Sequence, residues 1–158
     1  MRIWHLAAHL TAQQQFGLTL PDWTKSVFPD KITNVAVSDF YLHTATKELR
    51  KIVLGNLLEK ILNDIKAKIQ NTSERKIHLY SAHDYNPAHI LIFFNVMFNH
   101  IPNYGACIIF EVYDFGIKHG IKLKYKESKF VEFRYMTFAN GSNTLDLDEF
   151  ERMIRDLE

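Results

Sequence analysis

The chain has 158 residues, of which 47% are hydrophobic and 12 are phenylalanine, so it can bury a sizeable core and is not a disordered chain. Its 19 Lys and Arg residues against 18 Asp and Glu residues leave a net charge of +1, which gives no strong field for nucleic acid or an anionic membrane. No apolar run is long enough to cross a bilayer. We therefore expect one domain over residues 1–158, with no nucleic-acid partner and no membrane segment.

The first ten residues have the pattern of a short helix. His5 and His9 are four residues apart, a spacing that can present two metal ligands on a helix. No Glu follows His5 as it would in an H-E-x-x-H motif, so a half-buried surface helix is favoured, and no metal or cofactor is predicted. The stretch also lacks a small-residue cleavage site after a long apolar core, so it is not predicted to be a signal peptide.

Two helices are predicted after an ordered connector at residues 16–29. Residues 32–46 have a mixed pattern that favours a helix. Residues 47–69 give the clearest helical signal, because their apolar residues repeat with a period near 3.6. The repeating residues are Leu54, Leu57, Leu58, Ile61, Leu62, Ile65 and Ile69.

Residues 76–87, K-I-H-L-Y-S-A-H-D-Y-N-P, predict a buried strand that ends at a His-Asp pair and turns at once into a helix. Asn86 is a suitable N-cap, and Pro87 fits the first helical position. His83 and Asp84 would then lie between the end of a strand and the positive end of a helix, where α/β sheets bind anions. Such a pair offers a cation for a phosphoryl oxygen and a carboxyl group for proton transfer.

The rest of the chain predicts one buried helix, several strands and a closing helix. Residues 89–100 are apolar almost all round, as in a helix covered on every side. Residues 107–115 read as a strand, and residues 121–126 alternate apolar residues with lysines, as in a strand with one wet face. Residues 130–138 are a candidate hairpin partner, and Asp146 is a candidate cap for the last helix.

Three polar or reactive residues lie within these apolar stretches. His89 is interpreted as a structural histidine with its hydrogen bonds satisfied. Glu111 interrupts a strand and is expected to find partners within the protein, since a buried carboxylate needs them. Cys107 is the only cysteine, so no disulfide can form within the chain, and we interpret it as a small buried residue.

Two blocks of the sequence resemble the histidine acid phosphatases. Residues 80–84, Y-S-A-H-D, match the C-terminal motif of that family, and residues 101–113, I-P-N-Y-G-A-C-I-I-F-E-V-Y, look like its P-x-Y-A-S-C-x-x-x-E-L-Y segment. Residues 17–23, G-L-T-L-P-D-W, are similar to its G-L-x-L-P-x-W segment. The resemblance implies an α/β fold, namely part of the histidine-phosphatase (phosphoglycerate mutase-like) fold, with a mixed sheet flanked by helices.

The resemblance also implies a reaction, the hydrolysis of phosphate monoesters through a phosphohistidine. In the family an N-terminal R-H-G-x-R-x-P motif supplies the nucleophilic histidine. Carried over to this sequence, His83 would bind the phosphoryl group and Asp84 would protonate the leaving alcohol. The sequence has no R-H-G, so we expect the C-terminal portion of the family fold, which carries only this half of the site. Tyr85 replaces the usual Thr or Ser, which predicts a bulky ring at the lip of the pocket.

Two hypotheses of function follow. In the first, this is an acid phosphatase chain whose activity belongs to a full-length form or needs a complementing N-terminal half. In the second, it is a non-catalytic phosphatase-like domain that binds a phosphorylated ligand or a partner through the His83–Asp84 corner. A metal-dependent phosphohydrolase of the His-Asp helical type is a distant third, because those enzymes place the pair within a helical domain with further ligands. Missing strands would expose a sheet edge or an apolar face, so association into a homo-oligomer is also expected.

The sequence does not determine the cellular compartment of the protein. The family resemblance implies secretion or the lysosome, although the cysteines that secreted members usually carry are absent. Asn71-Thr72-Ser73 and Asn140-Gly141-Ser142 are sequons for N-glycosylation in loop-like surroundings. Asn71 and Asn140 are therefore candidate glycosylation sites.

Overall fold

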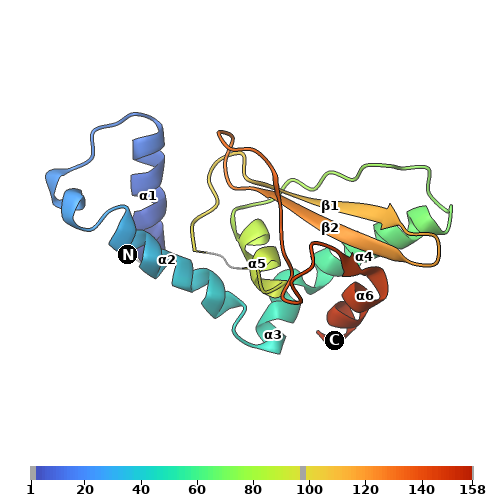
Figure 1. Cartoon of the computed structure of the whole chain (residues 1–158). Helices are drawn as coiled ribbons and strands as arrows, with labels where there is room; N and C mark the ends of the chain where they lie inside the picture. The colour runs from blue at the N-terminus through green and yellow to red at the C-terminus, as the bar shows by residue number, and fades with distance from the viewer. Residues whose placement is uncertain (1–2, 97–98, 158) are drawn as a thin grey trace.

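The structure is a computed structural model that describes residues 3–96 and 99–157 (Figure 1). The N-terminal helix α1 (Ile3–Gln15) leads through the short 3-10 helix η1 (Asp22–Ser26) into α2 (Asp30–His43). Helices α1 and α2 enclose a small apolar cluster and stand at one end of the molecule in Figure 1. The buried residues of that cluster are Ala7, Leu10, Phe28, Ile32 and Ala36.

The long helix predicted at residues 47–69 is confirmed, with one local irregularity. It comprises α3 (Lys47–Arg50), the π-helical turn η2 (Lys51–Gly55) and α4 (Asn56–Ile69). Its periodic apolar residues form the buried stripe, because side chains three and four positions apart share one face. The buried residues of the stripe are Leu54, Leu58, Ile61, Leu62 and Ile65.

The predicted buried strand at residues 76–80 is wrong. This segment is extended, but it joins no strand of the described sheet, and the side chains of Ile77 and Leu79 are 76% and 91% exposed. Its β propensity is sufficient for an extended backbone but not for a strand, because a strand needs a neighbour that takes up its N–H and C=O groups. No such neighbour lies beside it in the described part of the chain.

Helix α5 (Tyr85–Phe93) follows and is buried along most of its length, as its apolar composition predicts. It begins before the predicted range of 89–100 and ends earlier, at Phe93. Asn95 then has a φ of 55°, a left-handed backbone conformation that cannot continue a helix. Residues 97 and 98 of the predicted range lie outside the described residues.

The sheet has four strands, β1 (Cys107–Asp114), β2 (His119–Lys126), β3 (Arg134–Tyr135) and β4 (Leu145–Asp146). β2 is central and pairs with each of the other three strands. A mixed sheet was expected, whereas the pairings in the described residues are all antiparallel. The alternation predicted for β2 is confirmed, because its apolar residues are buried while its lysines are half-exposed.

Cys107 is exposed at the start of β1, so its prediction as a buried residue is wrong. It stands opposite Lys126 in the β1–β2 register, on the face of the sheet that carries the lysines.

The main core lies between the sheet and the helices on its other face, α4, α5 and α6 (Leu147–Arg155) (Figure 1). Phe94, Phe110 and Phe150 meet there with ring centroids about 6 Å apart, a spacing typical of aromatic pairs. The Asp146 side chain caps α6 by accepting a hydrogen bond from the Asp148 N–H at 3.0 Å, as predicted. The α/β class with helices flanking a sheet is confirmed. Among the described residues, no helix has the length and apolar composition needed to cross a membrane.

Candidate functional site

The His-Asp pair lies at the junction between the extended segment and α5. His83 is exposed, and its backbone N–H donates a hydrogen bond to Asn86 Oδ1 at 3.1 Å. The half-buried Asp84 is the N-cap of α5, since its Oδ1 accepts a hydrogen bond from the Tyr85 N–H at 3.0 Å. The prediction of Asn86 as the cap and Pro87 as the first helical residue is therefore wrong. Both candidates are good caps by residue type, and Asp84 is the one whose carboxylate reaches a free N–H.

Burial raises the pKa of the Asp84 carboxyl above its usual value. The Tyr85 N–H and the charge of His83 oppose this shift, because both favour the carboxylate. A carboxyl group with a raised pKa keeps its proton to a higher pH and can donate it to a leaving group. The raised pKa makes Asp84 a candidate proton donor.

Tyr85 packs inward at the start of α5, and its expected place at the lip of a pocket stays a prediction. Its hydroxyl donates a hydrogen bond to Asp39 Oδ2 on α2 at 3.2 Å, and its ring packs against several aromatic side chains of α1, α2 and α5. Ring centroids lie 5.2 Å away at Trp4, 5.0 Å at Phe40, 5.3 Å at His43 and 5.5 Å at His89. Tyr85 therefore ties the start of α5 to α2.

His89 is a buried histidine, but its hydrogen bonds are not satisfied as predicted. Only 3% of the residue is exposed, and its Nε2 has no hydrogen-bond partner among the described residues. Burial, with the neighbouring His43 adding to the effect, lowers the pKa of His89 to about 4, while Asp39 opposes the shift. The imidazole is held neutral in the interface between α2 and α5.

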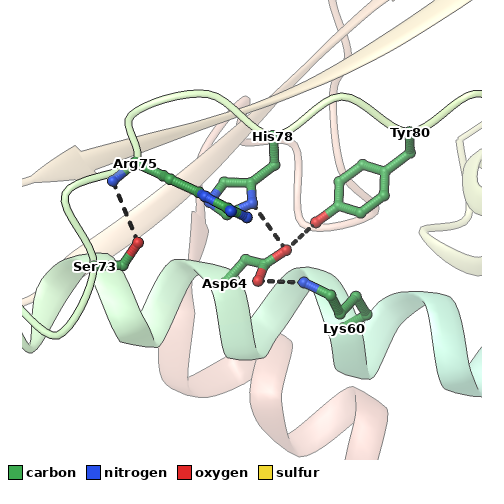
Figure 2. A network of polar contacts seen from close by, with 6 residues as sticks. All are labelled: Lys60, Asp64, Ser73, Arg75, His78 and Tyr80. Carbon is green, nitrogen blue, oxygen red and sulfur yellow. Dashed lines mark hydrogen bonds and ion pairs between the residues drawn. The ribbon is translucent and has the colours of Figure 1, made fainter.

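A polar network fixes the extended segment to α4 just before the corner (Figure 2). The Asp64 carboxylate on α4 accepts hydrogen bonds from Lys60 on the same helix and from the Tyr80 hydroxyl. His78 Nδ1 lies 3.1 Å from Asp64 Oδ2. His78 and Tyr80 therefore face α4, whereas Ile77 and Leu79 between and beside them face outward.

A hollow of the described surface lies elsewhere, at the turn between β1 and β2. Its volume is about 440 Å³, and neither His83 nor Asp84 lines it. The lining residues are Phe115, Lys118, His119, Gly120, Asn140, Ser142, Thr144, Asp146 and Glu149. The candidate site is the His83–Asp84 corner, because it brings together an exposed imidazole and a half-buried carboxyl with a raised pKa.

The other sequence candidates lie apart from this corner. Asn71 lies in the turn after α4 with a φ of 55°, and Asn140 Oδ1 accepts a hydrogen bond from the Ser142 N–H at 2.9 Å in another turn. Both are exposed, and their glycosylation stays a prediction. His9 Nδ1 lies 2.6 Å from the His5 backbone oxygen, and no cluster of three metal-binding side chains occurs in the described ranges. Glu111 has the partners that were expected, since it pairs with Lys124 at 2.7 Å and accepts from Tyr113 at 2.8 Å.

Sequence reasoning missed the two carboxylates that flank the corner, Asp39 and Asp64. Each is an acidic residue within a predicted helix, and the sequence pattern does not distinguish it from an ordinary solvent-exposed residue. The Lys60 and Asp64 spacing of four residues signals an intrahelical pair, but it does not show that Asp64 also binds residues sixteen positions later. Only the packed structure shows that Asp64 binds Tyr80 and that Asp39 binds Tyr85.

The sequence was compared with known proteins. Residues 20–136 match the Histidine phosphatase superfamily (branch 2). The chain is 32% identical over 119 residues to venom acid phosphatase Acph-1 of Apis mellifera, an alignment that covers 73% of this chain and 31% of that protein. It is 24% identical over 148 residues to prostatic acid phosphatase of Rattus norvegicus, with coverages of 92% and 39%. For lysosomal acid phosphatase of the same species, the identity is 28% over 114 residues, with coverages of 70% and 27%.

The chain therefore spans only about a third of the length of these relatives. The matched region includes the His83–Asp84 corner.

Proposed function

Because this chain belongs to branch 2 of the histidine phosphatase superfamily, we propose that its His83–Asp84 corner grips the phosphoryl group of a phosphate monoester and protonates the leaving alcohol. The observation that carries the proposal is the pairing of an exposed imidazole with a half-buried carboxyl whose pKa is raised. The first turn of α5 adds its backbone N–H groups and the positive end of its dipole.

The proposed chemistry is phosphoryl transfer to a histidine. An imidazole nitrogen forms a bond to phosphorus while the ester P–O bond breaks, and the proton of Asp84 passes to the departing oxygen. The Asp84 carboxylate then takes a proton from the water that attacks the phosphohistidine, which releases inorganic phosphate. His83 stabilises the charge on the phosphoryl oxygens in both steps.

The sequence contains no R-H-G, the core of the motif that supplies the nucleophilic histidine in the family. We infer that the corner acts as one half of a site that a complementing part of the family fold completes. The exposed apolar side chains of Ile77 and Leu79 support this, since they form a face that such a part, or a second copy of the chain, would cover. The same missing motif favours the alternative, a non-catalytic domain that binds a phosphorylated ligand or a partner. Secretion or lysosomal residence, with sugar on Asn71 or Asn140, is proposed only from the family.

Binding of inorganic phosphate at about pH 5 tests the corner without requiring turnover. We expect His83→Ala to weaken phosphate binding by about tenfold or more, because a hydrogen bond to a charged group contributes roughly 1.5–3 kcal/mol. The measurement is isothermal titration calorimetry or phosphorus NMR titration of the purified chain. His9→Ala is the matched control, since His9 is an exposed histidine on α1. The proposal would be refuted if the unaltered chain, His83→Ala and His9→Ala bound phosphate with equal affinity, or if the unaltered chain did not bind it.

A further inference from the structure

The segment that leads into the His83–Asp84 corner is held without a β ladder. The backbone groups of residues 76–82 take part in none of the backbone hydrogen bonds found among the described residues. A segment of this kind would be free to move if no side chains held it. The corner therefore depends on the contacts that its flanking residues make.

One contact lies before the corner, between Tyr80 and Asp64 of α4 (Figure 2). The Lys60 and Tyr80 hydrogen bonds lower the pKa of Asp64, so its carboxylate stays ionised and accepts. Burial and the Asp64 charge raise the pKa of Tyr80 to about 12, so its hydroxyl keeps the proton that it donates. His78 adds a second contact from the same segment to the same carboxylate.

The other contact lies just after the corner, between Tyr85 and Asp39 of α2. The Tyr85 hydroxyl donates to Asp39 Oδ2 at 3.2 Å, and the ring is packed among the side chains of α1, α2 and α5. His83 and Asp84 thus lie between two tyrosines whose hydroxyls are bonded to carboxylates on two different helices. Tyr80 and Tyr85 are five residues apart, so they can be separated by at most about 18 Å of extended chain.

We propose that the pairs Tyr80–Asp64 and Tyr85–Asp39 are positioning pairs that set the geometry of His83 and Asp84 for phosphate. The proposal rests on the function proposed above. Each pair fixes one end of a short connection, and together they replace the neighbouring strand that would otherwise hold it. Because the tyrosines act through the corner, neither needs to touch the ligand.

Tyr80→Phe and Tyr85→Phe test this with little change in packing, since each removes one hydroxyl. Tyr104→Phe is the matched control, because Tyr104 is 62% exposed and its hydroxyl has no bond among the described residues. The N–H groups of His83, Asn86 and Ala88 are hydrogen-bonded across the corner, to Asn86 Oδ1, the His83 oxygen and the Asp84 oxygen. We expect amide hydrogen exchange at these three residues to accelerate about three- to tenfold in each test variant, the factor that one lost hydrogen bond gives. We expect the Asp84 pKa, followed by NMR, to fall toward its ordinary value as the carboxyl becomes more solvated.

Affinity for inorganic phosphate should fall in the same two variants by a similar factor, and Tyr104→Phe should change none of the three quantities. Exchange rates and an Asp84 pKa that match those of the unaltered chain in both test variants would overturn the positioning role. So would an equal change in Tyr104→Phe. If exchange and the Asp84 pKa shift as expected while no protein binds phosphate, the positioning role stands and the proposed function fails.

Discussion

Replacing Phe40 by alanine is expected to lower the free energy of unfolding by about 3–5 kcal/mol, the usual cost of deleting a buried phenyl ring. Phe40 has no exposed surface and belongs to the main core. Its ring packs edge-on against Tyr85 at 5.0 Å and against His89 at 6.2 Å. The deletion would leave a cavity between α2 and α5, the interface that supports the corner.

Urea denaturation followed by circular dichroism measures this loss. Phe130→Ala is the matched control, because Phe130 is 81% exposed and should change the free energy by no more than about 0.5 kcal/mol. Similar losses in the two variants would contradict the packing described for α2 and α5. A large loss confined to Phe40→Ala would support it.

The folded chain is expected to lose stability as the pH falls from about 6.5 to about 4, and His89→Phe should remove much of that loss. Burial holds the pKa of His89 at about 4 in the folded state, below its ordinary value of 6.5. Between these values the unfolded chain binds a proton that the folded chain does not, so the free energy of unfolding rises with pH. Over the whole pH range, this difference between the folded and unfolded pKa of His89 contributes about 1–3 kcal/mol to the free energy of unfolding.

Denaturation midpoints across this pH range test the prediction. The groups that face His89 are His43, Asp39 and Tyr85, and all three remain in His89→Phe. His9→Gln removes an exposed histidine and should leave the slope unchanged. A pH dependence that persists in His89→Phe would place the acid sensitivity in other groups.

Local patterns predicted the helices well and the strands less well. The apolar repeat of residues 47–69 is sufficient to fix a helix and its buried face, because helical hydrogen bonds are made within the segment. The hydrogen bonds of a strand are made with another segment, so the extended preference of residues 76–80 could not decide whether a partner would be present. The alternation of β2 succeeded because its partners are nearby in the sequence and were predicted with it.

Local sequence likewise identified some residues of the candidate site and missed others. His83 and Asp84 could be found from their motif and from the helix that follows them. The sequence could not show that Asp84, and not Asn86, caps the helix. Both residue types cap helices, and the choice depends on which side chain reaches a free N–H. Asp39 and Asp64 depend on packing between helices and a distant segment, which no local pattern encodes.

We propose that His83 and Asp84 form the phosphate-binding and proton-donating half of a histidine phosphatase site, without its nucleophile. Hydrolysis of an aryl phosphate at about pH 5 by the purified 158-residue chain tests it most directly, with His83→Ala beside it and with trapping of any phosphoenzyme. We expect the unaltered chain to bind phosphate yet to give no turnover above buffer and no phosphohistidine. Turnover that is lost in His83→Ala, or a phosphoryl group trapped on any histidine of this chain, would contradict it.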